Sequence, residues 1–111
     1  MDEFSWFVGL YEGEGCLSSG LAKKKYKGRV LTSPKLELTI KMVDEDVIER
    51  AAKYLGVSYH KVKPNPGCKQ LYRVRKNGGL NGGLREILED MRPHLSKRRQ
   101  EQLDAKINKF D

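Results

Sequence analysis

Three glycines, Gly9, Gly13 and Gly15, interrupt the apolar segment near the start of the chain. Asp2 is a favourable N-cap, and the apolar residues after it predict a helix over about residues 3–13. Gly9 and Gly13 are four positions apart, so they lie on one face of this helix, where a second helix can approach to backbone distance. Gly13 can equally be the residue that ends the helix.

A period-two pattern marks the clearest strand. The even-numbered positions of residues 36–42 are apolar, and Glu37, Thr39 and Lys41 alternate with them. This alternation predicts a sheet with one buried face and one face open to water. The other expected strands lie at 16–22, 57–63 and 69–76, and a basic turn follows the first of them at 23–29. Three further helices are expected. The first is capped by Asp44 and ended by Gly56, the next is ended by Pro93, and the last is capped by Ser96. We therefore expect one α+β domain over residues 1–111, with an antiparallel sheet backed by helices.

Charge indicates the kind of partner. The chain has 22 Lys and Arg residues and a net charge of +7, which favours a polyanion, with nucleic acid ahead of anionic membrane. The open face of a basic sheet can enter a DNA groove. The residues expected on this face are Lys35, Glu37, Thr39, Lys41, Lys61, Lys63, Arg73 and Arg75. The basic turn adds Lys23, Lys24, Lys25, Lys27 and Arg29, which can follow a DNA backbone or form a solvated loop.

Four features together resemble the LAGLIDADG homing endonuclease family over nearly the whole chain. They are the sequence GLYEGEG at 9–15, the order of the elements, residues 42–48 entering the second helix, and RPHLSKRR at 92–99. The resemblance implies an αββαββα fold and a site-specific endonuclease that hydrolyses phosphodiester bonds of double-stranded DNA. A chain with one motif implies a homodimer, whose interface would contain Val8, Gly9, Glu12 and Gly13.

The resemblance also implies where the chemistry takes place. Glu14 would bind a divalent metal, Mg²⁺ or Mn²⁺, together with the backbone carbonyl of Gly13. Lys97 or Arg98 would lie near the reacting phosphate as the catalytic cation. Without the resemblance, Glu14 can be a solvated acid, and residues 97–99 can be plain contacts to the DNA backbone.

Two departures from the family pattern leave other functions open. Glu12 and Glu14 stand where the family more commonly has Asp, and Met42 falls about where many relatives have a polar residue near the scissile phosphates. A DNA-binding protein of the same fold without cleavage is therefore an alternative. The resemblance implies a further alternative, a maturase-like protein that binds intron RNA through the same basic sheet, since some relatives of the family have that role. The N-terminus has no signal-peptide pattern and no apolar run is long enough to span a membrane, so a cytoplasmic protein with access to DNA and without a small-molecule cofactor is expected.

Overall fold

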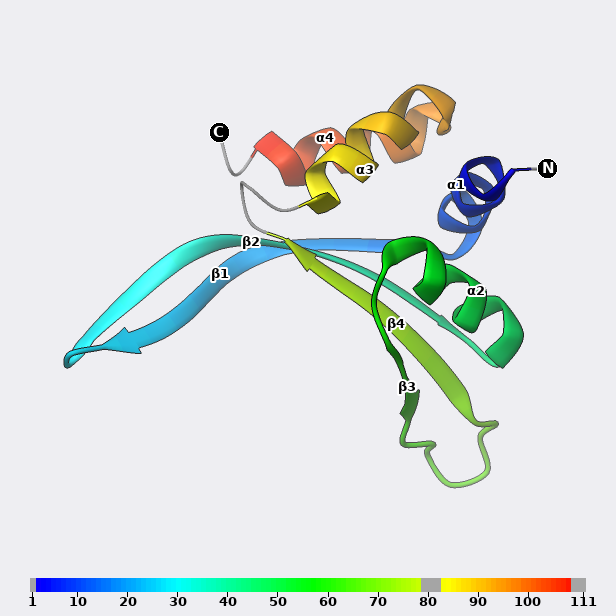
Figure 1. Ribbon diagram of the computed structural model, residues 1–111, viewed down its shortest axis with the longest axis horizontal. Helices are drawn as coiled ribbons and strands as arrows, with labels where there is room; N and C mark the ends of the chain where they lie inside the picture. Colours follow the sequence, from blue (N-terminus) through cyan, green and yellow to red (C-terminus); the bar gives the residue numbers. More distant parts are fainter. Residues whose placement is uncertain (1, 79–82, 109–111) are drawn as a thin grey trace. The chain divides into compact units, whose positions relative to one another are not determined.

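The computed structural model describes residues 2–78 and 83–108. Its elements are α1 (Glu3–Glu14), β1 (Cys16–Tyr26), β2 (Arg29–Met42), α2 (Glu45–Leu55), β3 (Tyr59–Val62), β4 (Leu71–Gly78), α3 (Gly83–Met91), the 3₁₀ helix η1 (Arg92–His94) and α4 (Lys97–Asn108) (Figure 1). The strands form one sheet in the order β1-β2-β4-β3, which confirms the predicted α+β class. The described residues fall into two compact units. The first comprises residues up to Cys16 and Leu38–Lys76, and the second comprises Leu17–Glu37 and the residues from Asn77 onward.

The core of the first unit includes the contact between α1 and α2. Asp2 caps α1 as predicted, because its carboxylate accepts a hydrogen bond from the Ser5 amide at 2.7 Å. Phe7 of α1 stacks on Tyr54 of α2, with ring centroids 4.6 Å apart. The buried apolar side chains of this unit are Phe7, Val8, Tyr11, Leu38, Ile40, Ile48, Ala51, Ala52, Leu55 and Val74.

Helix α2 also follows the prediction closely. It ends at Gly56, which has the left-handed φ of 71° that glycine adopts without strain. Lys76 of β4 donates from Nζ to the carbonyl of Leu55 at 3.0 Å, and so binds one of the carbonyls that the helix end leaves without a partner. Asp44 stands directly before α2, but its side chain makes no capping hydrogen bond.

The hairpin of β1 and β2 is longer than predicted. Its turn consists only of Lys27 and Gly28, whose φ angles are 48° and 78°. Two positive φ angles are typical of the tight turn that matches the twist of paired strands. The expectation that all of residues 23–29 form a turn is therefore wrong, because Lys23, Lys24 and Lys25 lie in β1 and Arg29 lies in β2, all of them exposed.

The pairing of β3 with β4 fixes which side chains share a face. Tyr59 lies opposite Val74, His60 opposite Arg73, and Lys61 opposite Tyr72. Residues directly opposite each other in an antiparallel pair point to the same side. Because Val74 is buried, Lys61 and Tyr72 lie on the covered side and His60 and Arg73 on the open side.

The expectation that Lys61 shares the open face with Arg73 is therefore wrong. The register pairs odd residues of β3 with even residues of β4, and the loop between the strands sets this offset. Lys63, expected on the same face, lies beyond the last residue of β3 and is exposed.

Helices α3 and α4 of the second unit both contact η1. Helix α3 ends at Met91, and Pro93 lies within η1. The predicted cap of α4 is confirmed, since the Ser96 hydroxyl accepts a hydrogen bond from the Arg99 amide at 3.3 Å. The buried apolar residues of this unit are Leu36, Leu84, Leu88, Met91, Leu95, Leu103 and Ile107. No helix among residues 2–78 and 83–108 has the length and apolar character needed to cross a membrane.

Candidate nucleic-acid interface and catalytic centre

A close contact between Gly15 and Tyr11 ends helix α1. The Gly15 amide donates to the Tyr11 carbonyl at 2.9 Å, and a Cβ atom on Gly15 would lie only 2.4 Å from the Tyr11 ring. Glycine is thus required by packing, although its φ of −72° is open to any residue. The helix continues through Gly13 to Glu14, so the interpretation of Gly13 as the helix end is wrong.

Gly9 and Gly13 form a bare strip on the exposed side of α1. Both residues are exposed, and a Cβ atom built on either one meets no other atom within 4 Å. Glu12 beside them is half-buried. Val8, which is expected at the same interface, is only 8% exposed within the chain and offers little surface to a partner.

Glu14 lies exposed at the C-terminal end of α1. This end of a helix is negative, and the last carbonyls, including that of Gly13, have no partner inside the helix. The last turn contains no basic residue that would compensate the dipole. A carboxylate beside such carbonyls provides the oxygen ligands that Mg²⁺ prefers. Glu14 and the Gly13 carbonyl therefore fit the expected metal.

One chain does not assemble a complete set of metal ligands within the described residues. In that part of the chain, no group of three His, Cys, Asp or Glu side chains is placed to hold an ion.

Three cations occupy the first turn of α4, and no acid accompanies them. Positive side chains at a helix N-terminus oppose the helix dipole, so the arrangement costs stability unless an anion binds there. Lys97 and Arg98 are exposed, whereas Arg99 is half-buried and donates from Nη1 to Gln102 at 3.3 Å. The exposed pair is thus the part of this turn that a phosphate can reach.

The segment that leads into α4 is held by several polar contacts. Arg92 donates to both carboxylate oxygens of Asp104, at 2.8 and 2.7 Å, and this pairing lowers the pKa of Asp104. The side-chain amide of Gln100 donates to the carbonyls of Arg92 and Leu95, at 2.9 and 3.2 Å. These hydrogen bonds fix where α4 begins and hence the position of Lys97 within the second unit. Glu14 belongs to the first unit.

The open face of β2 follows the predicted alternation. Leu36, Leu38 and Ile40 are buried, while Lys35, Glu37 and Thr39 are half-buried and Lys41 is exposed. Met42 has the parity of the buried set and is half-buried. We conclude that Lys41, and not Met42, is the open-face residue at this end of the strand.

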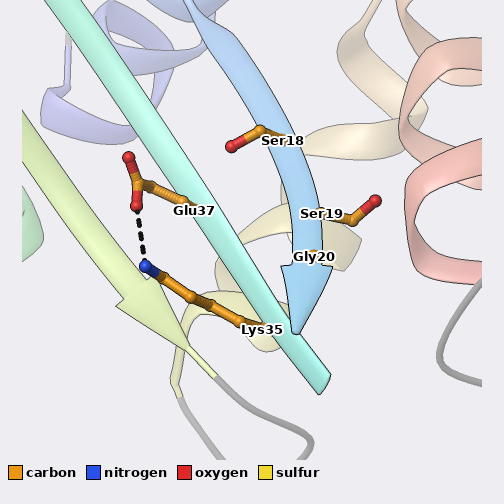
Figure 2. A pocket seen from close by; sticks show the side chains of 5 residues that line it. All are labelled: Ser18, Ser19, Gly20, Lys35 and Glu37. Carbon is orange, nitrogen blue, oxygen red and sulfur yellow. Dashed lines mark ion pairs between the residues drawn. The ribbon is translucent and has the colours of Figure 1, made fainter. Parts of the chain in front are cut away.

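A shallow pocket of about 180 Å³ lies on the hairpin, beside Lys35 and Glu37 (Figure 2). The Lys35 ammonium and a Glu37 carboxylate oxygen are 3.3 Å apart. The other residues that line the pocket are Ser18, Ser19 and Gly20 of β1.

The open face of β4 presents Arg73 and Arg75, as predicted. Arg73 is half-buried, and its Nε atom is buried without a hydrogen-bond partner among the described residues. A buried donor without a partner is costly to stability. Sequence reasoning misses His60, opposite Arg73, because only the strand register reveals its place on this face.

Most of the chain is similar to one known protein family. Residues 7–108 match the LAGLIDADG endonuclease family, and the chain belongs to that family. No curated protein gave a match.

Solved structures of homing endonucleases share the fold. I-CvuI, crystallised with the I-CreI target, is 21% identical with a TM-score of 0.62, and the match covers 92% of this chain and 61% of that one. I-TnaI is 20% identical with a TM-score of 0.60, and the match covers 94% of this chain and 67% of I-TnaI. The archaeal intron-encoded I-Vdi141I, complexed with DNA, is 19% identical with a TM-score of 0.59, and the match covers 93% of this chain and 65% of I-Vdi141I. This chain thus spans less than two thirds of the length of I-CvuI.

Proposed function

We propose that this chain is a site-specific endonuclease that binds double-stranded DNA as a homodimer. It would hydrolyse one phosphodiester bond on each strand with a divalent metal, Mg²⁺ or Mn²⁺. The observation that carries the proposal is the end of α1, where the bare strip of Gly9 and Gly13 runs directly to the exposed carboxylate of Glu14.

The glycine strip supports the homodimer. Helices approach most closely where both present small residues, and a two-fold axis brings the same patch of each copy together. Packing two copies of α1 at Gly9 and Gly13 would place two Glu14 carboxylates near each other. The pair would then supply ligands that the described part of one chain does not gather by itself.

The charge distribution supports DNA as the substrate. The net charge of +7 is accompanied by exposed lysines along β1 and by Arg73 and Arg75 on the open face of β4. I-CvuI and I-Vdi141I, which share the fold, were both solved with DNA. Contacts to phosphates would provide affinity, and the open strands would provide contacts to base edges.

The proposed reaction assigns one role to the residues at the end of α1 and another to the cations at the start of α4. Glu14 and the Gly13 carbonyl would hold the metal, which when bound neutralises phosphate charge and makes water a stronger nucleophile. Lys97 and Arg98, at the N-terminus of α4, would bind the phosphate and stabilise the negative charge that grows on its oxygens during attack.

The test begins with selection of bound duplexes from a randomised DNA library, followed by incubation of the enriched duplex with Mg²⁺. Wild-type protein should cut both strands. Glu14→Gln should bind the same duplex but cut about 100-fold more slowly or worse, because a metal ligand is lost. Glu101→Gln, an exposed change on α4, removes the same charge and serves as the matched control.

Two results would contradict the proposal. One is Glu14→Gln cutting at the wild-type rate. The other is a wild-type protein that retains one sequence but never nicks it, which would favour binding without cleavage. Equal affinity for a structured intron RNA would favour the maturase-like alternative. Comparing Lys97→Met with Arg98→Met on the same duplex assigns the catalytic cation, since loss of that cation should slow cleavage of the bound duplex far more than it weakens binding.

A further inference from the structure

Two opposite charges share the open face of the β1–β2 hairpin. Lys35 and Glu37 are two residues apart on β2, so they point to the same side of the strand, and their ion pair spans 3.3 Å (Figure 2). The Glu37 side chain is 20% exposed and that of Lys35 is 41% exposed. The pair therefore presents a donor directly beside an acceptor.

Beside this pair, β1 leaves open space. A Cβ atom on Gly20 would meet nothing within 4 Å, and the neighbouring Ser18 contributes only a small hydroxyl side chain. Figure 2 shows Ser19 directed away from the side on which Ser18 lies. The resulting pocket of about 180 Å³ is lined by both Lys35 and Glu37.

An acid on a DNA-binding face has few favourable partners. It is repelled by every phosphate, so the favourable partners that DNA itself offers are the amino groups that bases expose in the major groove. Glutamate characteristically accepts from the amino group of cytosine, and lysine characteristically donates to O6 and N7 of guanine. In a G·C pair these donor and acceptor groups lie side by side, because the two bases are paired to each other.

We propose that Lys35 and Glu37 together read one G·C base pair, with Lys35 donating to the guanine and Glu37 accepting from the cytosine. The inference rests on the proposed DNA-binding function and adds a specificity to it. The ion pair holds the two side chains in place before DNA binds, so little side-chain freedom is lost in the complex. The two charges balance each other, so this part of the face contributes selectivity more than affinity.

The test compares base preferences, which are obtained by selecting duplexes from a randomised library and sequencing them. Wild-type protein should show a position, repeated in the second half-site of a homodimer, where a G·C pair is preferred by about tenfold. Glu37→Gln should change that position to A·T, because an amide both donates to and accepts from adenine. Lys35→Met should weaken the preference there and leave the other positions unchanged.

Glu101→Gln and Lys53→Met remove the same charges from exposed helix positions and should alter no position of the selected sequence. The inference is overturned if Glu37→Gln and Lys35→Met change no position, or if the position they change is not G·C for wild-type protein. A wild-type protein that enriches no sequence at all overturns the proposed function, and this inference with it.

Discussion

Gly13 and Gly15 are two residues apart at the end of α1 but have different structural roles. Gly15 is buried against its own helix, because the Tyr11 ring occupies the space of a side chain. Gly13 is exposed, with open space where a Cβ would stand. Sequence alone predicts a glycine-rich helix end. It does not distinguish the two residues, because the difference lies in packing and not in backbone angles.

The first prediction concerns Gly13→Leu. Within one chain the new side chain meets no atom at its Cβ, and leucine favours a helix over glycine, so the free energy of unfolding of dilute protein should rise by about 0.5–1 kcal/mol. Association of two chains should be abolished, because the close approach of α1 to its copy is blocked. Thermal unfolding and sedimentation of the same sample measure both effects.

Gly15→Ala provides the contrast. Its Cβ would lie 2.4 Å from the Tyr11 ring, so this change should destabilise the single chain by about 1–3 kcal/mol. If Gly13→Leu proves as destabilising as Gly15→Ala, or if it still associates normally, the assignment of Gly13 to an interface fails.

At the scale of elements, one cluster of side chains fastens α1 to α2. Arg50 of α2 donates from Nε to Glu3 at 3.0 Å, and its guanidinium carbon lies 4.2 Å from the centre of the Trp6 ring. The hydrogen bonds from Arg50 hold the pKa of Glu3 below its usual range. Because α1 presents both the glycine strip and Glu14, this cluster supports the proposed catalytic centre from the opposite end of the helix.

The second prediction is a pH-dependent effect of Arg50→Met. The pKa of Glu3 is lower in the folded chain than in the unfolded chain. The stability that the Glu3–Arg50 ion pair adds to the folded chain is therefore complete at neutral pH and is lost as the pH falls through the lowered pKa. The variant should melt below wild type at pH 7, and the difference should shrink in acid. In a Glu3→Gln background, Arg50→Met should lower the melting temperature by less than it does in the wild-type chain. If Arg50→Met lowers the melting temperature of the wild-type chain equally at every pH, the role of the ion pair is refuted.

The third prediction concerns the hairpin. Lys23, Lys24 and Lys25 are exposed along β1, and Figure 1 shows the hairpin reaching beyond α3 and α4 of its own unit. Changing all three to Gln should weaken DNA binding. The slope of the logarithm of the binding constant against the logarithm of the salt concentration should become less steep by about 0.9 for each DNA phosphate that a chain no longer neutralises. The selected base sequence should stay the same. An unchanged salt slope would show that the hairpin does not touch the DNA backbone.

Elements with a strong internal pattern can be predicted, and those that depend on their partners cannot. The alternation of residues 36–42 and the Gly56 cap are sufficient to predict the second half of β2 and the end of α2. The basic residues of β1 resemble a turn in the sequence, because a lysine-rich strand shows no alternation. The placement of Lys61 fails because its face depends on the register with β4, which is a property of two strands.

At the scale of the whole molecule, the family and much of the candidate site can be predicted, because short polar motifs lie at element ends that the sequence marks well. The match over residues 7–108 confirms the family. His60 and the buried Nε of Arg73 cannot be predicted, since both follow from strand pairing and burial. The homodimer remains the central proposal, since the described part of one chain gathers no set of metal ligands.

The most direct test is the mass of the protein–DNA complex in solution, measured by sedimentation or native mass spectrometry on the enriched duplex, together with the strands cut in that sample when Mg²⁺ is added. A homodimeric endonuclease should place two chains on each duplex and break both strands. One chain on each duplex, still cutting both strands, would contradict a centre built from two copies of Glu14.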